Sequence, residues 1–362
     1  MRTGILSMQQ ITNYGSFLQA YGLKSILQNM GHDVEFINIV PGRQLPQYRI
    51  SRLHKIKLLL NRLKVKHPLR QLRYTVNLHK RFNKEFKPEL GVRAGNSDGK
   101  FDCVVIGSDE VFNIAQKTWF GFSTQLFGEG LNADRVISYA GCFGATTTEI
   151  LKETGIDEEV SALLKKMDAI SVRDENSMKV VRDLTGSDPV LNVDPVIAYD
   201  FEKEIRLPET TEDYLLVYTY PGRMRDQAEI KAISSFAREK GLKILAIANY
   251  FDWVDEVVTP HPFEVLGYFK KARYVVTDTF HGAVMSIKYN RQFAVLVRQM
   301  NSNKLSFLLK QFGLSDRIVG SLSQLPVILE TPIDFAPINK LIENERQRTG
   351  RYLELWCPAD PK

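Results

Sequence analysis

Three ionisable side chains stand just after apolar runs that have the composition of buried strands. His281 follows YVVT (274–277) within the sequence TDTFHG, Arg173 follows AISV (169–172), and Asp109 closes the sequence DCVVIGSD. An imidazole titrates close to pH 7 and so suits proton transfer, whereas a guanidinium binds a carboxylate or phosphate through parallel donors. A carboxylate can orient or deprotonate a hydroxyl. These residue types indicate acid–base chemistry on an anionic substrate.

Each of the three residues also has a purely structural interpretation. His281 would cap the helix expected to follow it. Arg173 would form a surface pair with Asp174 or Glu175. Asp109 would be an N-cap, a common role for an aspartate after a strand. The residue types by themselves leave both interpretations open.

Two loops supply further candidates for substrate binding. Ser108 and Asn113 belong to the same loop as the aspartate. Asn13, Tyr14 and Gly15 form the first turn between a strand and a helix. Backbone N–H groups at a helix start can bind an anion or a sugar hydroxyl. The alternative is that these residues only shape their turns.

The elements that position these residues alternate between strand and helix patterns. Residues 3–8 and 34–40 are predicted strands around a helix at 17–30, whose apolar positions recur at helical spacing and which ends at Gly31. Short connections favour a parallel, right-handed crossover. In parallel α/β sheets ligands bind beyond the carboxyl ends of the strands, where the three ionisable residues stand.

The alternating pattern starts again after a polar segment, RLPETTED, whose proline suits an interdomain linker. We therefore predict an α/β fold with two Rossmann-like domains that face each other across a cleft. The predicted boundaries are 1–205 for the first domain, 206–213 for the linker, 214–330 for the second domain and 331–362 for a C-terminal helical segment.

A strongly basic segment interrupts the first predicted domain. Residues 43–88 contain 14 Lys and Arg against one acid, Glu85, in a chain of net charge +6, so the remaining chain is net negative. Leu53, Ile56, Leu60 and Leu63 recur at helical spacing, as do Leu78, Phe82 and Phe86, which predicts two amphipathic helices. They would pack on the core with their cations in solvent, or adsorb to an anionic membrane surface. A basic patch on an acidic body is typical of a local contact with something anionic and not of a protein that binds nucleic acid throughout.

Composition and absent motifs narrow the function classes. No apolar run has the length of a membrane span, and the start of the chain lacks a signal-peptide pattern. The three cysteines are far apart, which favours a reducing compartment, so we expect a cytoplasmic protein. The chain has no P-loop, G-x-G-x-x-G, H-E-x-x-H, D-x-D or G-x-S-x-G motif. These absences favour chemistry without a metal or a cofactor.

Six segments of the chain resemble the polysaccharide pyruvyltransferase family. They are ITNYGSFLQAYGLKSIL (11–27), FDCVVIGSDEVFN (101–113), ISYAGCFGATT (137–147), ISVRDENS (170–177), VDPVIAYDF (193–201) and VVTDTFHGAVMSIKYNRQFAV (275–295). The segments occur in the order that the family has and extend over most of the chain. The resemblance implies a fold similar to GT-B glycosyltransferases.

The resemblance also implies roles for individual residues. His281 corresponds to a histidine implicated in catalysis, and Gly282 and Ala283 after it are expected to leave room for a ligand. Arg173 corresponds to an arginine that binds phosphoenolpyruvate. Asp109 is the candidate to act on an acceptor hydroxyl. Asp194, before a proline, is interpreted as architectural.

One position departs from the family pattern. Some members have an arginine two residues before the histidine, where this chain has Thr279. Lys304, Arg298 or Arg291 could supply the missing cation, and Lys304 is favoured because it opens a predicted helix.

The resemblance implies transfer of the pyruvyl group of phosphoenolpyruvate to a sugar as a cyclic ketal, with release of phosphate. The acceptor would be a lipid-linked unit of a capsule or exopolysaccharide, bound on the side of the first domain, with the donor on the side of the second. The enzyme would be cytoplasmic or peripheral at the membrane. A GT-B glycosyltransferase that uses a sugar nucleotide, and a glycan- or RNA-binding protein, are the alternatives, because fold does not fix function.

Overall fold

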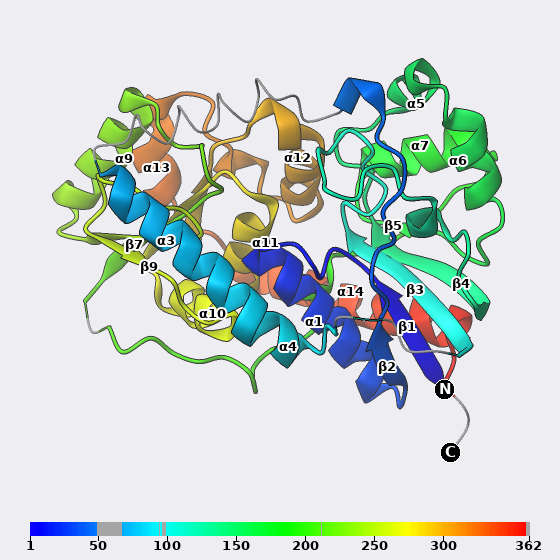
Figure 1. The fold of residues 1–362 in the computed structure, drawn as a ribbon. Helices are drawn as coiled ribbons and strands as arrows, with labels where there is room; N and C mark the ends of the chain where they lie inside the picture. The colour runs from blue at the N-terminus through cyan, green and yellow to red at the C-terminus, as the bar shows by residue number, and fades with distance from the viewer. Residues whose placement is uncertain (49–66, 94, 96–98, 211, 360–362) are drawn as a thin grey trace. The chain divides into compact units, whose positions relative to one another are not determined.

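The computed structural model describes residues 1–48, 67–93, 95, 99–210 and 212–359 (Figure 1). The chain forms two compact units. The first comprises Met1–Ser51, Lys87–Asp200 and Glu343–Lys362, and the second comprises Arg52–Phe86 and Phe201–Ile342. Each unit contains one sheet in which all paired strands are parallel, so the predicted α/β class with two Rossmann-like domains is confirmed.

The sheet of the first unit has six strands in the order β2-β1-β3-β4-β5-β6. Its strands are β1 (Arg2–Leu6), β2 (Asp33–Phe36), β3 (Phe101–Asp109), β4 (Ala133–Gly141), β5 (Ser171–Val172) and β6 (Val190–Leu191). Its helices include α1 (Tyr14–Asn29), α5 (Thr148–Thr154), α6 (Asp157–Leu164), α7 (Glu175–Thr185) and α8 (Pro195–Ala198). In this sheet β2 lies on one side of β1, and β3, the next strand in the sequence, lies on the other side. The strand order therefore reverses between β1 and β3, where such sheets bind ligands.

The sheet of the second unit has five strands in the order β11-β10-β7-β8-β9. Its strands are β7 (Tyr214–Tyr218), β8 (Lys243–Ile247), β9 (Glu256–Val258), β10 (Tyr274–Thr277) and β11 (Gln292–Val295). Its helices include α9 (Gln227–Glu239), α10 (Pro262–Lys271), α11 (Phe280–Lys288), α12 (Ser302–Gln311) and α13 (Leu325–Glu330). Here the order reverses between β7 and β10. We call these two places of reversal the ligand-binding edges, because sheets of this kind generally bind ligands there.

The central strands are buried along almost their whole length. All five residues of β7 are buried, as are residues 103–108 of β3. Parallel sheets covered on both faces need such continuous apolar strands, so the short apolar runs in the sequence became strands at these places. Each unit has a separate apolar core around its sheet.

The C-terminal helix does not form a segment of its own. Helix α14 (Phe335–Trp356) contributes its first residues to the second unit and the remainder to the first. In the first unit, the Tyr352 hydroxyl donates to the Ser138 carbonyl oxygen at 2.7 Å, and the Tyr139 hydroxyl lies 2.9 Å from Thr349 Oγ1. The predicted boundary at 331–362 differs from this arrangement because these polar contacts at β4 hold the end of the chain.

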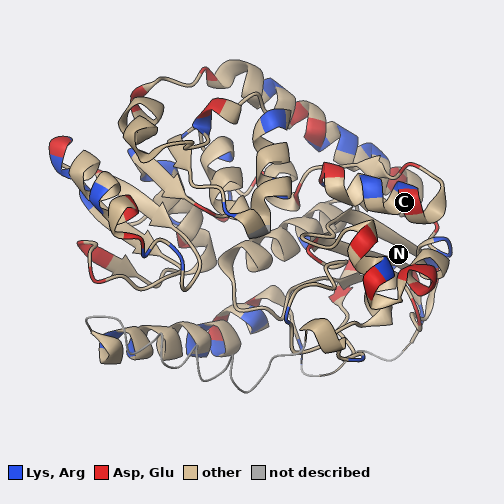
Figure 2. Cartoon of the chain, turned by 90° about the horizontal axis from the view of Figure 1, so that it is seen from above, with Lys and Arg blue, Asp and Glu red and all other residues tan. Residues whose placement is uncertain are grey.

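The described part of the basic segment contains a short 3-10 helix (Pro46–Tyr48) and one long helical stretch, and the long stretch belongs mostly to the second unit. Helix α3 (Pro68–Arg81) continues through a π-helical turn (Phe82–Phe86) into α4 (Lys87–Leu90). Basic residues outnumber acidic ones along it (Figure 2). The first predicted amphipathic helix, with Leu53, Ile56, Leu60 and Leu63, lies outside the described residues.

Aromatic contacts explain why α3 joins the second unit and not, as the sequence predicted, the first. The rings of Tyr74 and Tyr250 lie 6.1 Å apart, and those of Phe86 and His261 lie 4.9 Å apart edge to face. The Arg81 guanidinium donates to the Thr259 carbonyl oxygen. Among the described residues, no helix is long and apolar enough to cross a membrane.

Candidate active site

A buried polar cluster occupies the ligand-binding edge of the first unit. It joins the carboxyl ends of β1 and β3 to the start of α1. Ser7 Oγ, directly after β1, donates to the Ser108 carbonyl oxygen at 3.3 Å. Ser16 Oγ, in the first turn of α1, donates to Asp109 Oδ2 at 2.8 Å. The predicted pair Ser108 and Asp109 therefore stands at the point of strand-order reversal.

Arg173 is buried between two carboxylates. Its Nη2 donates to Asp109 Oδ1 at 2.9 Å, and its Nη1 donates to Asp194 Oδ2 at 2.5 Å. Only 1 % of the Arg173 side chain is exposed, against 13 % for Asp109 and 0 % for Asp194. The alternative of a surface pair with Asp174 or Glu175 is wrong, because the guanidinium is buried and pairs with other carboxylates. The Asp174 side chain caps α7 by accepting from Ser177 N at 2.8 Å. Arg173 fixes the orientation of Asp109.

Asp194 joins the turn before α8 to the buried cluster, and its contacts are structural, as predicted. Besides pairing with the guanidinium of Arg173, it accepts from Ser108 Oγ at 3.3 Å and, through Oδ1, from Val196 N at 2.9 Å, which caps α8. Ser108 Oγ also lies 3.2 Å from Gln19 Oε1. The sequence singled out Asp194 only as an architectural residue, and Ser16 was not among the predicted site residues. The one available signal was an aspartate after a strand, which is also the signal for an ordinary helix cap.

The remaining candidates of the first unit hold turns together. Asn13 caps α1, with Oδ1 accepting from Gly15 N at 2.7 Å. Tyr14, the first residue of that helix, is buried. Asn113 Nδ2 donates to Glu110 Oε2 at 2.6 Å, and its Oδ1 accepts from Thr146 Oγ1 at 3.0 Å. These contacts give each residue a structural role. Substrate binding by these residues stays a prediction.

The ligand-binding edge of the second unit centres on a buried aspartate. Asp278, directly after β10, accepts from Thr219 Oγ1, directly after β7, at 2.5 Å. Arg298 Nε donates to its other carboxylate oxygen at 3.1 Å. Burial raises the pKa of the Asp278 carboxyl, and the Thr219 hydroxyl, Arg223 and Arg298 oppose that rise. Asp278 was not among the site residues predicted from the sequence.

His281 lies in the first turn of α11, three residues after that aspartate. It is buried, and its ring meets that of Phe280 edge to face, with centroids 5.4 Å apart. The interpretation of His281 as the helix cap is wrong, because Thr279 Oγ1 fills that role by accepting from Gly282 N at 2.9 Å. The imidazole is therefore not needed to cap α11.

The space beside Gly282 is occupied by the hydroxyl groups of Thr277 and Thr279. A Cβ atom there would lie 2.1 Å from Thr277 Oγ1 and 2.7 Å from Thr279 Oγ1. The expectation that this glycine makes space for a ligand is thus corrected. Thr279 is fully buried, and its position at the cap explains why a small hydroxyl residue suits this place better than an arginine.

The three cations proposed in place of an arginine at 279 lie in different surroundings. Arg291 donates to the Tyr289 and Ala272 carbonyl oxygens before β11 begins, which is the opposite end of the sheet. Arg298 forms two bonds to the Glu229 carboxylate, of 2.5 and 2.9 Å. Lys304 Nζ lies 5.7 Å from the centre of the Phe280 ring, beside the start of α11. Lys304 and Arg298 thus both lie near the edge that carries His281, and donor binding by Lys304 stays a prediction.

A fourth cation was missed by the sequence analysis. Arg223 lies in the loop after β7, and its Nη1 donates to the Asp278 carbonyl oxygen at 3.2 Å. Its side chain is 23 % exposed and lies 3.8 Å from the Asp278 carboxylate. The available signal was its place in TYPGRMR, directly after a buried strand. Arg223 thus brings a partly accessible positive charge to the edge that carries His281.

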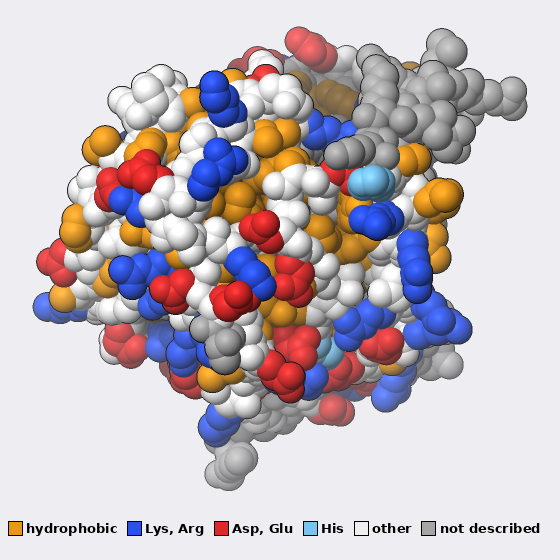
Figure 3. Space-filling model, turned by 90° about the vertical axis from the view of Figure 1, so that its left-hand side faces the viewer, with side chains coloured by type: hydrophobic (Ala, Val, Ile, Leu, Met, Phe, Trp, Pro, Cys, Tyr) orange, Lys and Arg blue, Asp and Glu red, His pale blue; other side chains and the backbone are white. Residues whose placement is uncertain are grey.

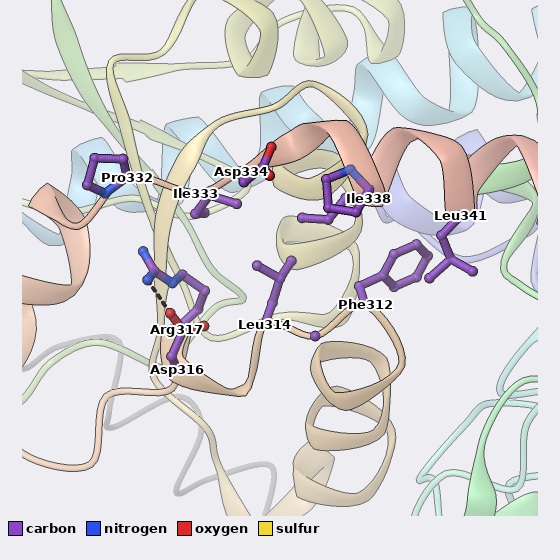
Figure 4. A pocket seen from close by; sticks show the side chains of 11 residues that line it. Phe312, Leu314, Asp316, Arg317, Pro332, Ile333, Asp334, Ile338 and Leu341 are labelled. Atoms are coloured by element: carbon purple, nitrogen blue, oxygen red, sulfur yellow. Dashed lines mark hydrogen bonds and ion pairs between the residues drawn. The ribbon is translucent and has the colours of Figure 1, made fainter.

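No metal site emerges from the part of the chain that the structure describes, which has no group of three or more His, Cys, Asp or Glu side chains able to hold an ion. Chemistry without a metal stays a prediction. A cavity of about 400 Å³ in the second unit is lined by Phe312, Leu314, Arg317, Ile333 and other residues (Figure 4). It contains none of the candidate site residues.

Comparisons with known proteins give one family and several distant structures. A family model described as polysaccharide pyruvyl transferase matches residues 13–299. No curated protein matches the chain. The glycosyltransferase SsfS6 of Streptomyces sp. SF2575, complexed with thymidine diphosphate, is 12 % identical over 98 % of this chain and 99 % of its own, with a TM-score of 0.49. UDP-GlcNAc 2-epimerase from Neisseria meningitidis is 10 % identical over 96 % and 94 %, with a TM-score of 0.47.

Proposed function

Because the chain belongs to the polysaccharide pyruvyl transferase family, we propose that it moves the pyruvyl group of phosphoenolpyruvate onto a sugar as a cyclic ketal. The family match over residues 13–299 carries this proposal, because it includes both ligand-binding edges. The acceptor is a sugar of a polysaccharide or of its lipid-linked precursor, as in capsule and exopolysaccharide synthesis. The donor is a substrate, and no cofactor takes part.

The reaction defines what the site has to supply. The methylene carbon of phosphoenolpyruvate gains a proton and becomes a methyl group. One sugar hydroxyl adds to the central carbon and loses its proton, the bond from that carbon to the phosphate oxygen breaks, and phosphate leaves. A second hydroxyl of the sugar then adds and loses its proton, which closes the ring. The site needs cations for two anionic groups and residues that transfer protons near neutral pH.

The second unit has the groups that suit the donor. His281 gives the proton to the methylene carbon, since an imidazole exchanges protons near pH 7. Arg223 and Lys304 bind the carboxylate and phosphate. The first N–H groups of α11 assist them, because a helix N-terminus attracts anions. The partial exposure of Arg223 and its place beside Asp278 support this assignment.

The first unit has the groups that suit the acceptor. Asp109 accepts the proton of a sugar hydroxyl, and Ser16 and Arg173 hold its two carboxylate oxygens. Direct binding of phosphoenolpyruvate by Arg173 would require its guanidinium to leave a carboxylate partner. We therefore assign Arg173 to positioning Asp109. Ser108, Asn113 and the turn at 13–15 remain candidates for contacts with the sugar.

Phosphate release from phosphoenolpyruvate, measured with a panel of galactosyl and N-acetylhexosaminyl acceptors, tests this function. We expect release that depends on an acceptor, together with a product that carries a pyruvate ketal. Thermal unfolding should show stabilisation by phosphoenolpyruvate. Stabilisation by a UDP- or GDP-sugar instead, without phosphate release from phosphoenolpyruvate, would point to a glycosyltransferase.

Arg223→Ala should raise KM for phosphoenolpyruvate about tenfold, because it removes a charge-assisted contact to the donor. Steady-state kinetics at saturating acceptor give this number. Lys231→Ala, which removes an exposed cation from the neighbouring helix α9, serves as the control and should leave KM unchanged. An unchanged KM in Arg223→Ala would remove this residue from the donor site.

A further inference from the structure

Helix α3 exposes a row of large apolar side chains. Leu69 is 79 % exposed, Leu72 is 50 % exposed and Val76 is 58 % exposed. Residues three and four apart lie side by side on a helix, so these three form one continuous stripe. Single exposed apolar residues are ordinary on a protein surface, whereas a continuous apolar stripe indicates an interaction site. We call these three residues the α3 stripe.

The packing of α3 shows that the α3 stripe is not the face that holds the helix in place. Gln71 is buried, and the Tyr74 ring contacts that of Tyr250. Phe82 and Phe86, just beyond the helix, are buried as well. These residues face the second unit and give α3 its own core contacts. The helix therefore has two apolar faces, of which one is used within the unit.

Positive charge borders the α3 stripe. Arg73 and Lys80 each follow a stripe residue, Leu69 and Val76, by four positions, so they lie along the same flank. Both are exposed. Basic and hydrophobic side chains adjoin on the side of the molecule where α3 lies (Figure 3). The whole segment 43–88 has 14 Lys and Arg against one acid, in a chain that is otherwise net negative.

From this combination we infer that α3 docks on an anionic lipid surface. An apolar stripe flanked by cations is the pattern of a helix that lies in the membrane interface. The stripe enters the boundary between headgroups and acyl chains, and Arg73 and Lys80 remain among the lipid phosphates. A nucleic acid would require the cations but would have no use for the stripe. The rest of the chain is net negative and is repelled by anionic lipids, so the contact with the lipid surface is expected at α3.

Lipid binding by α3 does not depend on the proposed donor or on the proposed reaction. A lipid surface would present a lipid-linked acceptor to the enzyme, but α3 contains no residue that we assign to the reaction. Loss of lipid binding should therefore leave phosphate release with a soluble acceptor unchanged. The two proposals can fail independently.

Co-sedimentation of the full chain with phosphatidylcholine vesicles, with and without phosphatidylglycerol, tests the inference. We expect binding to the anionic vesicles alone. Replacing the α3 stripe with glutamine (L69Q/L72Q/V76Q) keeps helix propensity and should weaken binding about tenfold or more. Neutralising the flank (R73Q/K80Q) should weaken it about tenfold as well, and high salt should act in the same direction.

Matched variants separate this effect from changes of surface composition. Val327→Gln removes an apolar side chain that is 65 % exposed on α13, and K231Q/R238Q removes two exposed cations from α9. Both should bind vesicles like the unaltered chain. Circular dichroism should show that all variants are folded. Loss of binding in the charge variant alone, together with binding of RNA or heparin, would overturn the inference in favour of a polyanion site. Equal binding by all variants, or none to anionic vesicles, would overturn it outright.

Discussion

Replacing His281 with alanine should lower the rate of phosphate release from phosphoenolpyruvate by about 10²–10⁴-fold, because a positioned acid–base group typically contributes that much. The donor should still bind, since Arg223, Lys304 and the start of α11 would remain. We therefore expect kcat to fall while KM for phosphoenolpyruvate changes little, which is the behaviour of a group that acts mainly in the transition state.

The substitution of His281 leaves the N-terminal cap of α11 intact. The cap of α11 is Thr279, so the helix keeps its N-terminal hydrogen bond when the imidazole is lost. His281→Gln serves as a second variant that retains much of the volume and a polar group but cannot exchange protons near pH 7. The alanine variant should lose some stability, because it leaves a cavity and loses the ring contact with Phe280, and the glutamine variant should lose less. Thermal unfolding should show that both variants are folded at the temperature of the assay. Full activity in His281→Gln would exclude proton transfer by this residue.

His261 provides a matched control. It is also buried and also lies at the start of a helix, where its Nδ1 accepts from Phe263 N at 3.3 Å and its ring packs on Phe86. Its replacement by alanine should lower the stability of the chain through the lost cap and ring contact. At a temperature where this variant is folded, its rate of phosphate release should remain near normal. The contrast between the two histidines separates catalysis from packing.

The positions of the candidate residues along the strands were predictable, and their partners were not. Short apolar runs such as DCVVIG and YVVT had to become buried strands, and the residues after them had to lie at carboxyl ends. Which side chains then meet depends on contacts distant in sequence. Asp109 and Arg173 are 64 residues apart, and the two serine contacts at this edge span 93 and 101 residues. No periodicity of the chain carries such information.

Distant contacts also explain the error about α3, whereas the error about Gly282 arose from local geometry. Helical spacing predicted an amphipathic helix in the basic segment but could not show that Tyr250 and His261, far along the chain, provide its packing surface. The space beside Gly282 is filled by the hydroxyls of Thr277 and Thr279, which the sequence did contain. Only the geometry of the turn between β10 and α11 reveals that these hydroxyls point at the glycine.

Asp194→Asn should destabilise the first unit by about 3–5 kcal/mol, the usual effect of removing one partner from a buried ion pair. The asparagine retains one oxygen, which can keep the α8 cap, but its amide nitrogen takes the place of the oxygen that accepts from Ser108 and Arg173. The change therefore removes both the charge and the acceptor that face Arg173. The guanidinium is almost completely buried and would lose one of the two carboxylates with which it forms an ion pair. Chemical denaturation measures the loss. Asp188→Asn, in the exposed pair with Arg182, is the control and should change stability very little.

A double variant separates the contribution of the Arg173–Asp194 pair to stability from its contribution to activity. Replacing both partners with apolar residues, R173M/D194L, removes the uncompensated guanidinium charge and should recover part of the stability lost in Asp194→Asn. It also removes the α8 cap and the cation beside Asp109, so the recovery should be incomplete. It cannot restore the contact between the guanidinium and Asp109 that orients the carboxylate. We therefore expect a folded protein whose phosphate release stays well below normal. A double variant with normal activity would mean that Asp109 needs no positioning by Arg173, and that the pair serves stability alone.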